Sequence, residues 1–424
     1  MDHAIRTFDG VSYPDAAASD PVTLGYMDGA PPPRSRLIRF SDDTFLRFPQ
    51  LRWSLSHLRE FVPTVTVSRG IGPPSDLGRV NAALATDIDA MTFLDLNGVV
   101  RTWAESLHET YTDGMIVLHR GRCVYEWYGG ALRADLTHAC FSITKSYAAT
   151  IAELLIHEGA LNAEQVVEFY LPQMGSSAFA GATVRQVLDM QVGVMFNEDY
   201  ADPAAGVWQY TRAAGLRPFP LGYTGPRSLY DYLPTLPAQG AHGVAFAYAT
   251  VCTEVLCWIL RRVSGKTFAA LLADRIWSRL GCDHSADLMV DSAGTEVGGA
   301  GLAATLRDVA RFGELLRCQG DWRGREVIPA AVIENMTRHT DRSKFPQAEY
   351  PLLAGYAYRS MWWVANDAFG TFEGRGIFGQ RLYVAPKAEI VIARFASHPV
   401  GSSAANDPIT LPAFRALATQ LMGH

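Results

Sequence analysis

Segments with strand-like composition stand near both ends of this chain, and helix-like segments fill the long stretch between them. Residues 115–120 and 123–130 are rich in β-branched and aromatic residues and flank a turn at Gly121, which predicts a hairpin. A similar strand-like composition recurs late in the chain, over residues 355–365, 376–386 and 388–397. The simplest assembly is an α+β fold whose antiparallel sheet is built from both chain ends, with helices packed against it.

The length of the chain bears on its domain organisation. Its 424 residues are 48% hydrophobic and 19% charged, which indicates a globular protein with a large buried core. We expect a single catalytic domain over residues 1–424. An α/β lobe would comprise about residues 1–160 and 300–424, and a mainly helical lobe would be inserted at about 161–299. A cleft between the lobes is the expected site.

Other segments show either the apolar spacing that is typical of helices or the composition that is typical of loops. Residues 1–80 are rich in Pro, Gly, Ser and Arg and predict an irregular segment that packs on the body. We expect helices at residues 97–111 with Asn97 as the cap, from Ser142 to Glu158-Gly159, within 246–265, at 267–281, at 303–318 with Thr305 as the cap, and at 411–421.

The segment Phe141-Ser142-Ile143-Thr144-Lys145 opens one of these helices and places a hydroxyl three residues from an amine. Residues i and i+3 lie on one face of a helix, so Lys145 can reach Ser142. Burial would lower the pKa of the lysine and let it take the serine proton. Chance alone gives roughly one or two Ser-x-x-Lys matches in such a chain, so the motif needs support.

Two further stretches could complete a serine mechanism. Tyr248 directly precedes an apolar helix and could relay a proton, although it could equally be a core tyrosine. The stretch Gly374-Arg375-Gly376-Ile377 could supply an oxyanion donor from a strand edge, where glycines would let the substrate approach closely. An ordinary turn into a strand is the alternative. The three parts in this order favour a catalytic site.

Other kinds of site find little support in the sequence. The chain has no GxSxG turn, and its histidines, such as His138, His242, His284 and His398, are isolated, which argues against a Ser-His-Asp triad. It has no HExxH motif and no paired Cys/His spacing, so we expect no metal and no cofactor.

Charge and cysteine use bear on partners and location. The net charge is −6 without a run of Lys or Arg, so we expect a small-molecule substrate and neither nucleic acid nor a membrane as partner. The first residues lack the apolar core of a secretory signal, and the six scattered cysteines fit buried free thiols, so we expect a cytoplasmic enzyme. A homodimer is compatible with the sequence, which does not fix the oligomeric state.

The order of these motifs resembles that of the penicillin-recognising serine hydrolases, which include class C β-lactamases, D-alanyl carboxypeptidases and related esterases. Within this group the chain resembles in particular the linear amidases that act on nylon oligomers. The shared stretches span roughly residues 50–420 and are Glu109 to Asp113, Ser142 to Ser146, Val187 to Gln191, Asn197 to Tyr200, Phe246 with Tyr248, Trp362-Trp363, and Gly374 to Gln380. The resemblance implies a β-lactamase/DD-peptidase-like fold.

The resemblance also implies roles for single residues. Ser142 would form an acyl-enzyme, while Lys145 would hold Tyr248 near deprotonation so that Tyr248 relays the proton. The N–H groups of Ser142 and Ile377 would bind the oxyanion. The remaining matches suggest that Tyr200 hydrogen-bonds the leaving amide nitrogen, that Trp363 walls the acyl pocket and that Thr250 contacts substrate. Glu198 and Asp199 could anchor their loop, or they could equally be solvated or capping carboxylates.

Several positions depart from the family pattern. Thr250 stands where Ser or Asn is usual, and the lysine of the third motif is absent. Arg375 in that motif could bind a substrate carboxylate or point away from the cleft. Thr211 carries no charge where an acidic residue would recognise an amine end, and Gly299 replaces a polar side chain. Recognition of an amine end is therefore in question.

Three functions remain open from the sequence. The first is hydrolysis of linear amides, either nylon-dimer-like or other ω-amino acyl amides, together with short-chain esters. The second is a carboxylesterase with little amidase activity, and the third is a penicillin-binding-like module without turnover. A true β-lactamase or cell-wall peptidase is disfavoured because the third-motif lysine is missing. Acyl chain length, stereoselectivity and the physiological substrate are not fixed by the sequence.

Overall fold

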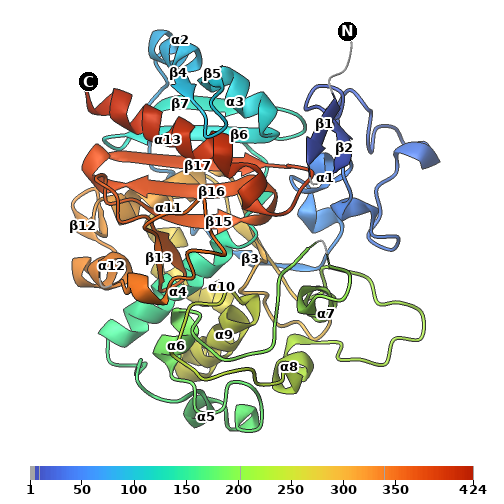
Figure 1. Ribbon diagram of the computed structural model, residues 1–424, viewed down its shortest axis with the longest axis vertical. Helices are drawn as coiled ribbons and strands as arrows, with labels where there is room; N and C mark the ends of the chain where they lie inside the picture. The colour runs from blue at the N-terminus through green and yellow to red at the C-terminus, as the bar shows by residue number, and fades with distance from the viewer. Residues whose placement is uncertain (1–4, 9, 201, 339, 424) are drawn as a thin grey trace.

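The computed structural model describes residues 5–8, 10–200, 202–338 and 340–423. Its largest sheet has seven strands in the order β13-β14-β15-β16-β17-β6-β7, all antiparallel, so segments from both ends of the chain lie side by side (Figure 1). The expected α+β sheet is confirmed. Its strands are β6 (Thr112–His119), β7 (Arg122–Tyr128), β13 (Ala357–Arg359), β14 (Trp362–Val364), β15 (Phe372–Gly376), β16 (Gln380–Ala385) and β17 (Ile390–Ala396).

Each face of this sheet is covered by helices. Ile116 and Leu118 of β6 enter the large core on the side of α11 (Leu306–Arg317), whereas Met115 and Val117 enter a second core beneath α13 (Asp407–Met422). This alternation follows from the two-residue period of a strand. Figure 1 shows α13 lying across the sheet, with α2 (Ala82–Ala90) and α3 (Trp103–Glu109) beside it. Because both faces are buried, the strands read as nearly continuous apolar runs.

Helix α4 (Ile143–His157) lies between the sheet and the helical lobe, in contact with β15 on one side and α9 on the other. Every residue from Ile143 to Leu155 is buried, and Gly159 ends the helix with a φ of 73°. Helices of the inserted region and its flank are α5 (Val167–Tyr170), α6 (Val184–Leu188), α7 (Gly206–Ala213), α8 (Leu229–Tyr232), α9 (Thr250–Ser264), α10 (Phe268–Arg275) and α12 (Ala330–Thr337).

A buried ion-pair network fastens the helical lobe to the sheet. Glu153 of α4 accepts hydrogen bonds from Arg185 at 2.6 Å and from the Ser360 hydroxyl at 2.5 Å. Asp189 accepts one from Arg359 at 2.8 Å. Since Arg359 ends β13 and Ser360 follows it in the turn to β14, these carboxylates connect α4 and the segment around α6 to the edge of the large sheet.

A smaller antiparallel sheet leads the chain into α4. It has the order β3-β9-β10-β8, and β8 is followed at once by residues 140–142 and the start of α4. Cys140 N–H donates to Leu302 O at 2.8 Å, which extends the pairing up to the serine. The strands are β3 (Thr64–Val67), β8 (His138–Ala139), β9 (Ala286–Met289) and β10 (Leu302–Ala304).

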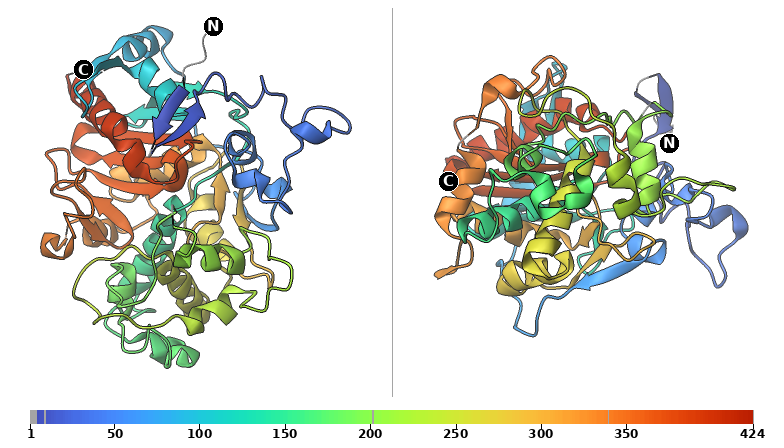
Figure 2. Two further views of the ribbon diagram at one scale, coloured as in Figure 1. Left: turned by 45° about the vertical axis from the view of Figure 1, so that its right-hand side comes forward. Right: turned by 90° about the horizontal axis from the view of Figure 1, so that it is seen from below.

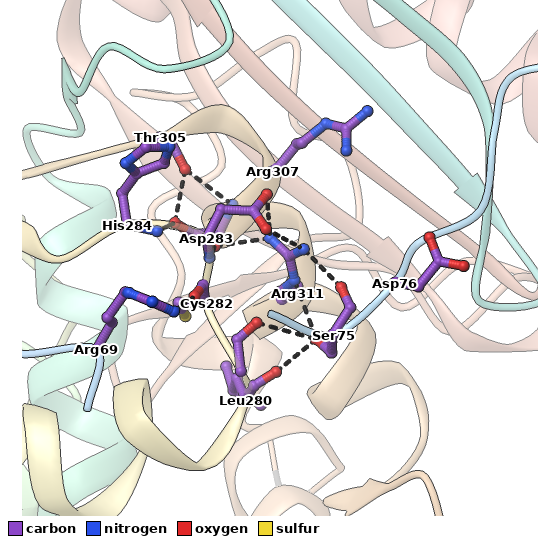
Figure 3. Close-up of polar contacts among 12 residues, drawn as sticks. Arg69, Ser75, Asp76, Leu280, Cys282, Asp283, His284, Thr305, Arg307 and Arg311 are labelled. Atoms are coloured by element: carbon purple, nitrogen blue, oxygen red, sulfur yellow. Dashed lines mark hydrogen bonds and ion pairs between the residues drawn. The ribbon is translucent and has the colours of Figure 1, made fainter. Parts of the chain in front are cut away.

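The N-terminal segment wraps one side of both lobes (Figure 2). It contains a hairpin of β1 (Ile5–Phe8) and β2 (Val11–Pro14), the short helix α1 (Leu51–Ser54), and otherwise mostly irregular chain, as expected. Figure 3 shows how its later part is attached: buried Arg311 of α11 donates to Ser75 O at 2.6 Å and to the carboxylates of Asp308 and Asp283 at 2.7 and 2.9 Å. The segment is therefore a fixed part of the body.

Four sequence predictions of elements were wrong in detail. The helix expected at 97–111 starts only at Trp103, because Val100–Thr102 forms strand β5, which pairs with β4 (Thr92–Leu94). Thr102, rather than Asn97, caps α3 in a capping box with Glu105. Residues 355–365 form the hairpin β13–β14 instead of one strand, and the helix expected at 267–281 ends at Arg275.

A small outlying hairpin comprises β11 (Asp321–Trp322) and β12 (Arg325–Glu326).

The remaining helices and the cysteines agree with the sequence predictions. Helix α11 is capped by Thr305, whose hydroxyl accepts from Asp308 N, and α13 contains the predicted final helix. All six cysteines are free thiols, and five of them are buried. Within the described ranges, the helices fall short of the length and apolar character that crossing a membrane requires.

Candidate active site

Ser142 occupies the N-terminal end of α4 at the floor of a cleft. The preceding Phe141 has a φ of 45°, a left-handed conformation that is costly for a large side chain and that turns the chain sharply into the helix. The N–H groups of Ile143, Thr144 and Lys145 donate to the carbonyls of Cys140, Phe141 and Ser142. The positive end of the helix therefore lies directly beneath the serine.

Lys145 contacts Ser142 as the three-residue spacing predicted. Its Nζ donates to Ser142 Oγ at 2.8 Å and to Gly299 O at 2.7 Å, and the side chain is 1% exposed. Burial lowers the pKa of Lys145 to about 8, while the nearby carboxylates of Glu198 and Glu254 act in the opposite direction. A lysine with such a pKa is partly neutral near pH 8 and can accept the serine proton.

Tyr248 precedes α9 and lies beside the same pair. Lys145 Nζ lies 5.2 Å from the centre of its ring, and Trp363 stacks on the ring at 5.7 Å with an interplanar angle of 25°. Burial holds the pKa of the Tyr248 phenol well above its usual value, and a hydrogen bond with Ser142 acts in the other direction. This pKa favours a neutral phenol, contrary to the expected near-deprotonated state.

The sequence predicted that glycines on the third-motif strand would let substrate approach closely, and Gly376 does border the cleft. Gly374 and Gly376 also let the strand pack closely against α4 and the residue Cys140 that precedes it. A Cβ on Gly376 would lie 2.7 Å from Cys140 O, and one on Gly374 would lie 3.2 Å from Ser146 Oγ. Strand β15 can thus approach α4 closely enough to bring Ile377 beside the serine, and both residues line the cleft. The chain turns away directly after Ile377, where Phe378 has a φ of 62°.

The loop that carries Tyr200 is anchored by Glu198. The carboxylate accepts from Thr250 N at 2.6 Å, at the first residue of α9, and from the Tyr200 hydroxyl at 3.1 Å. Burial and Glu198 together raise the pKa of Tyr200 well above its usual value, so its phenol keeps its proton. The predicted anchoring role of Glu198 is thus visible in its contacts.

Two cavities meet at the serine. The wide one has a volume of about 980 Å³ and is bordered by Tyr248, Trp363 and the N-terminal hairpin residues Phe8, Val11 and Tyr13. The narrow one has a volume of about 210 Å³ and is bordered by Thr211, Thr250 and Arg217, among others. Ser142, Tyr200 and Ile377 border both. A linear substrate can therefore place one arm on each side of Ser142.

Arg375 borders the wide cavity, but its charge already has protein partners. Its guanidinium is hydrogen-bonded to Asp407, lies 3.9 Å from Glu373 and stacks 5.3 Å from the ring centre of Trp363. Asp407 and Glu373 also bind the fully buried Arg381. Arg375 therefore does not point away from the cleft, and its ion pairs indicate a further role that neither sequence interpretation named, which is to fix the cleft wall. Binding of a substrate carboxylate by Arg375 stays a prediction.

The sequence analysis missed the residue that holds Lys145 in place. Buried Glu254 of α9 accepts from Gly298 N at 3.0 Å, Gly299 N at 2.8 Å and the Tyr210 hydroxyl at 2.7 Å. It thereby fixes the turn whose carbonyl binds Lys145. A lone acidic residue within the apolar run of residues 250–260 was the available signal. A Cβ on Gly299 would lie 2.8 Å from Glu254 Oε1, so this position cannot carry the polar side chain expected there.

Known proteins share this architecture. A family model described as Beta-lactamase matches residues 100–413. The 6-aminohexanoate-dimer hydrolase of Paenarthrobacter ureafaciens is 32% identical over 398 residues, which cover 91% of each chain. A solved structure from Bacillus anthracis, provisionally named a 6-aminohexanoate-dimer hydrolase, is 29% identical with a TM-score of 0.80, over 92% of this chain and 98% of that one. These similarities confirm the resemblance and the β-lactamase-like fold.

A more distant structure shares the fold alone. A family VIII carboxylesterase has a TM-score of 0.55 at 17% identity, over 80% of this chain and 99% of that chain. Amide-related and ester-related names thus both occur among proteins with this fold. The fold by itself therefore does not decide the substrate.

Proposed function

The chain belongs to the beta-lactamase family of hydrolases, and we propose that it cleaves linear amides and short-chain esters through an acyl-enzyme on Ser142. The observation that carries the proposal is the contact of 2.8 Å between Lys145 Nζ and Ser142 Oγ at a helix N-terminus. Burial that lowers the pKa of Lys145 to about 8 supplies the base that a serine nucleophile needs.

Acylation begins with attack of Ser142 Oγ on the substrate carbonyl carbon. The serine proton passes to neutral Lys145, and the carbonyl oxygen becomes an oxyanion that accepts from the N–H groups of Ser142 and Ile377. The bond to the leaving nitrogen or oxygen then breaks. The Tyr248 phenol gives its proton to the leaving group and regains one from the Lys145 ammonium.

Deacylation repeats these steps with water as the nucleophile. Water enters from the wide cavity, loses its proton to Lys145 and attacks the acyl carbon. The second oxyanion collapses and expels Ser142 Oγ, which recovers a proton. Both half-reactions use the same base and the same oxyanion donors, so a single arrangement of residues serves both.

Tyr200 matters for amides more than for esters. An amide nitrogen must be protonated as it leaves, whereas an alkoxide or phenoxide is a better leaving group. The Tyr200 hydroxyl donates its proton to Glu198, so its oxygen can accept a hydrogen bond from the leaving N–H and orient the nitrogen toward Tyr248, which delivers the proton. A carboxylesterase with little amidase activity is the second candidate, favoured by the lack of a carboxylate among the described residues that border the narrow cavity.

A substrate panel with Ser142→Ala as the control tests this function. We expect the wild-type protein to hydrolyse p-nitrophenyl acetate and a linear amide, and Ser142→Ala to lose at least about a thousandfold in kcat for both. A fluorophosphonate should label the wild type and leave Ser142→Ala unlabelled. Ester turnover without amide turnover would select the carboxylesterase, and the absence of both turnover and label would point to a binding module.

A further inference from the structure

The narrow cavity, which meets Ser142, is lined by a single positive charge and by no carboxylate among the described residues. Among the described residues that border it, Arg217 is the one with a charged side chain, and the others are apolar, aromatic or hydroxyl-bearing. Thr211, at the position where the family resemblance led us to expect an acidic residue, is neutral and directs its hydroxyl to Trp208 O at 3.0 Å. The pocket therefore offers an ammonium group no carboxylate among these residues.

Arg217 is held in place with its charge incompletely balanced. Its guanidinium lies 4.1 Å from the ring centre of Trp208, and Nη2 lies 3.2 Å from Asp43 Oδ2. Its buried Nε has no hydrogen-bond partner within the described chain. Burial lowers the pKa of Arg217, and the neighbouring arginines Arg212 and Arg47 lower it further, so three cations share this corner with Asp43. An additional anion would be stabilised here.

The wide cavity has the opposite character. Four carboxylates, those of Glu198, Asp199, Glu349 and Asp407, border it together with one arginine, Arg375, which is paired with Asp407. Tyr248, which protonates the leaving group, borders the wide cavity and is absent from the lining of the narrow one. The leaving group must therefore depart on the wide side, which places the acyl arm of the substrate in the narrow pocket.

We propose that the narrow pocket selects an acyl arm that ends in a carboxylate, which Arg217 binds, so that the preferred substrates are half-esters or half-amides of dicarboxylic acids. The inference rests on the proposed function and deepens it. A guanidinium suits a carboxylate, whereas it repels the ammonium end of an ω-amino acyl group. A volume of about 210 Å³ is room for roughly seven water-sized groups, which matches an arm of similar length.

The test compares three p-nitrophenyl esters with six-carbon acyl arms that differ only at the far end. The monoester of adipic acid ends in a carboxylate, the hexanoate ester ends in a methyl group, and the 6-aminohexanoate ester ends in an ammonium. We expect kcat/KM to decrease in that order, with at least about a tenfold difference between the first and the last. The preference should weaken as salt is added, because Arg217 is partly exposed.

Variants assign the preference to a side chain. Arg217→Gln should reduce the ratio of kcat/KM for the carboxylate ester to that for the hexanoate ester by about tenfold. Arg227→Gln is the matched control: this arginine also stacks on an aromatic ring, that of Phe219 at 4.9 Å, but it borders neither cavity and should keep the wild-type ratio. Thr211→Asp leaves Arg217 in place and should shift the preference toward the ammonium ester, which keeps the test decisive if Arg217→Gln is unstable.

The outcomes separate this inference from the proposed function. Turnover of the hexanoate ester that depends on Ser142 supports the function whatever the order of the three esters. Preference for the ammonium ester, equal rates for all three, or a carboxylate preference that survives Arg217→Gln would each overturn the inference alone. Failure of every ester, with no label on Ser142, would instead overturn the function.

Discussion

At Lys145, burial removes the amine from bulk water while Ser142 Oγ and Gly299 O accept its hydrogen bonds. Desolvation disfavours the charged form, and the carboxylates of Glu198 and Glu254 limit the effect. The balance leaves a base that can be neutral in mildly alkaline solution. In the proposed mechanism, the ionisation of this single side chain sets the pH range in which the site can work.

The pH dependence of the reaction should follow that ionisation. Below its pKa the lysine is an ammonium and cannot take the serine proton, so kcat/KM for a neutral ester should rise about tenfold per pH unit. It should level off above the lysine pKa of about 8. Initial rates between about pH 5.5 and 9.5 measure this. A profile that falls through this region would show that the ammonium is the active form.

Glu254 should act on the reaction through Lys145. Glu254→Gln removes a negative charge that raises the pKa of Lys145, so the midpoint of the rate profile should move to lower pH. Because the amide holds the Gly298–Gly299 turn less firmly, kcat should fall about tenfold while KM changes little.

A matched control separates this positioning role from a general loss of stability. Glu296 is also a buried carboxylate of the same region, but it pairs with Arg261 and does not contact the Gly299 turn. Glu296→Gln should lower the melting temperature and leave the pH midpoint in place. Equal midpoints for both variants and the wild type would count against the role of Glu254.

Among the elements, strand β15 packs closely against helix α4, and glycines on the strand make this packing possible. Gly376→Ala would place a methyl group 2.7 Å from Cys140 O and 2.9 Å from Gln380 Cβ, so the strand must move away from the helix. We expect a loss of about 1–3 kcal/mol in the free energy of unfolding. If Ile377 N–H binds the oxyanion as proposed, activity should fall further still, because Ile377 would move relative to Ser142 in the cleft that both residues line.

The control for this substitution is Gly72→Ala. Gly72 has open space around its would-be Cβ and does not have a positive φ, so a methyl group there should be tolerated. Urea unfolding and ester hydrolysis measured on both variants give the comparison. A Gly376→Ala protein with wild-type activity would show that the strand does not need this close contact.

The predictability of these elements depended on the range of the interactions behind them. The helical spacing of apolar residues over 303–318 and the cap at Thr305 involve only residues close in sequence, so α11 could be predicted from them. Val100 is compatible with either a helix or a strand, and only its pairing with Leu94 of β4 decides for a strand. The contact of Ser142 with Lys145 followed from spacing within one helix, whereas that of Glu254 with the Gly299 turn joins residues 45 apart.

Over the whole molecule, the long N-terminal segment depends on a few buried attachments. Arg311→Ala should lower the free energy of unfolding by about 3–5 kcal/mol, because Asp308 and Asp283 would lose a buried partner. It should also expose the chain near Ser75 to proteases. Chemical denaturation and limited proteolysis would measure the two effects.

Arg307, four residues earlier on α11, provides the control for the Arg311→Ala substitution. Figure 3 shows its side chain directed away from the Arg311 cluster, and its own partner is Glu126 at a more exposed place. Arg307→Ala should cost about 1 kcal/mol or less and leave the proteolysis pattern unchanged. Similar losses for both arginines would mean that burial does not strengthen the Arg311 attachment.

The hairpin β1–β2 gives the wide cavity part of its wall, through Phe8, Val11 and Tyr13. These residues lie far outside the stretch 100–413 that matches the family, while the serine, lysine and tyrosine lie inside it. The substrate-facing surface and the reactive groups can therefore diverge at different rates. In evolutionary terms, a lineage could exchange this appendage for another and acquire new substrates while its inherited chemistry stayed intact.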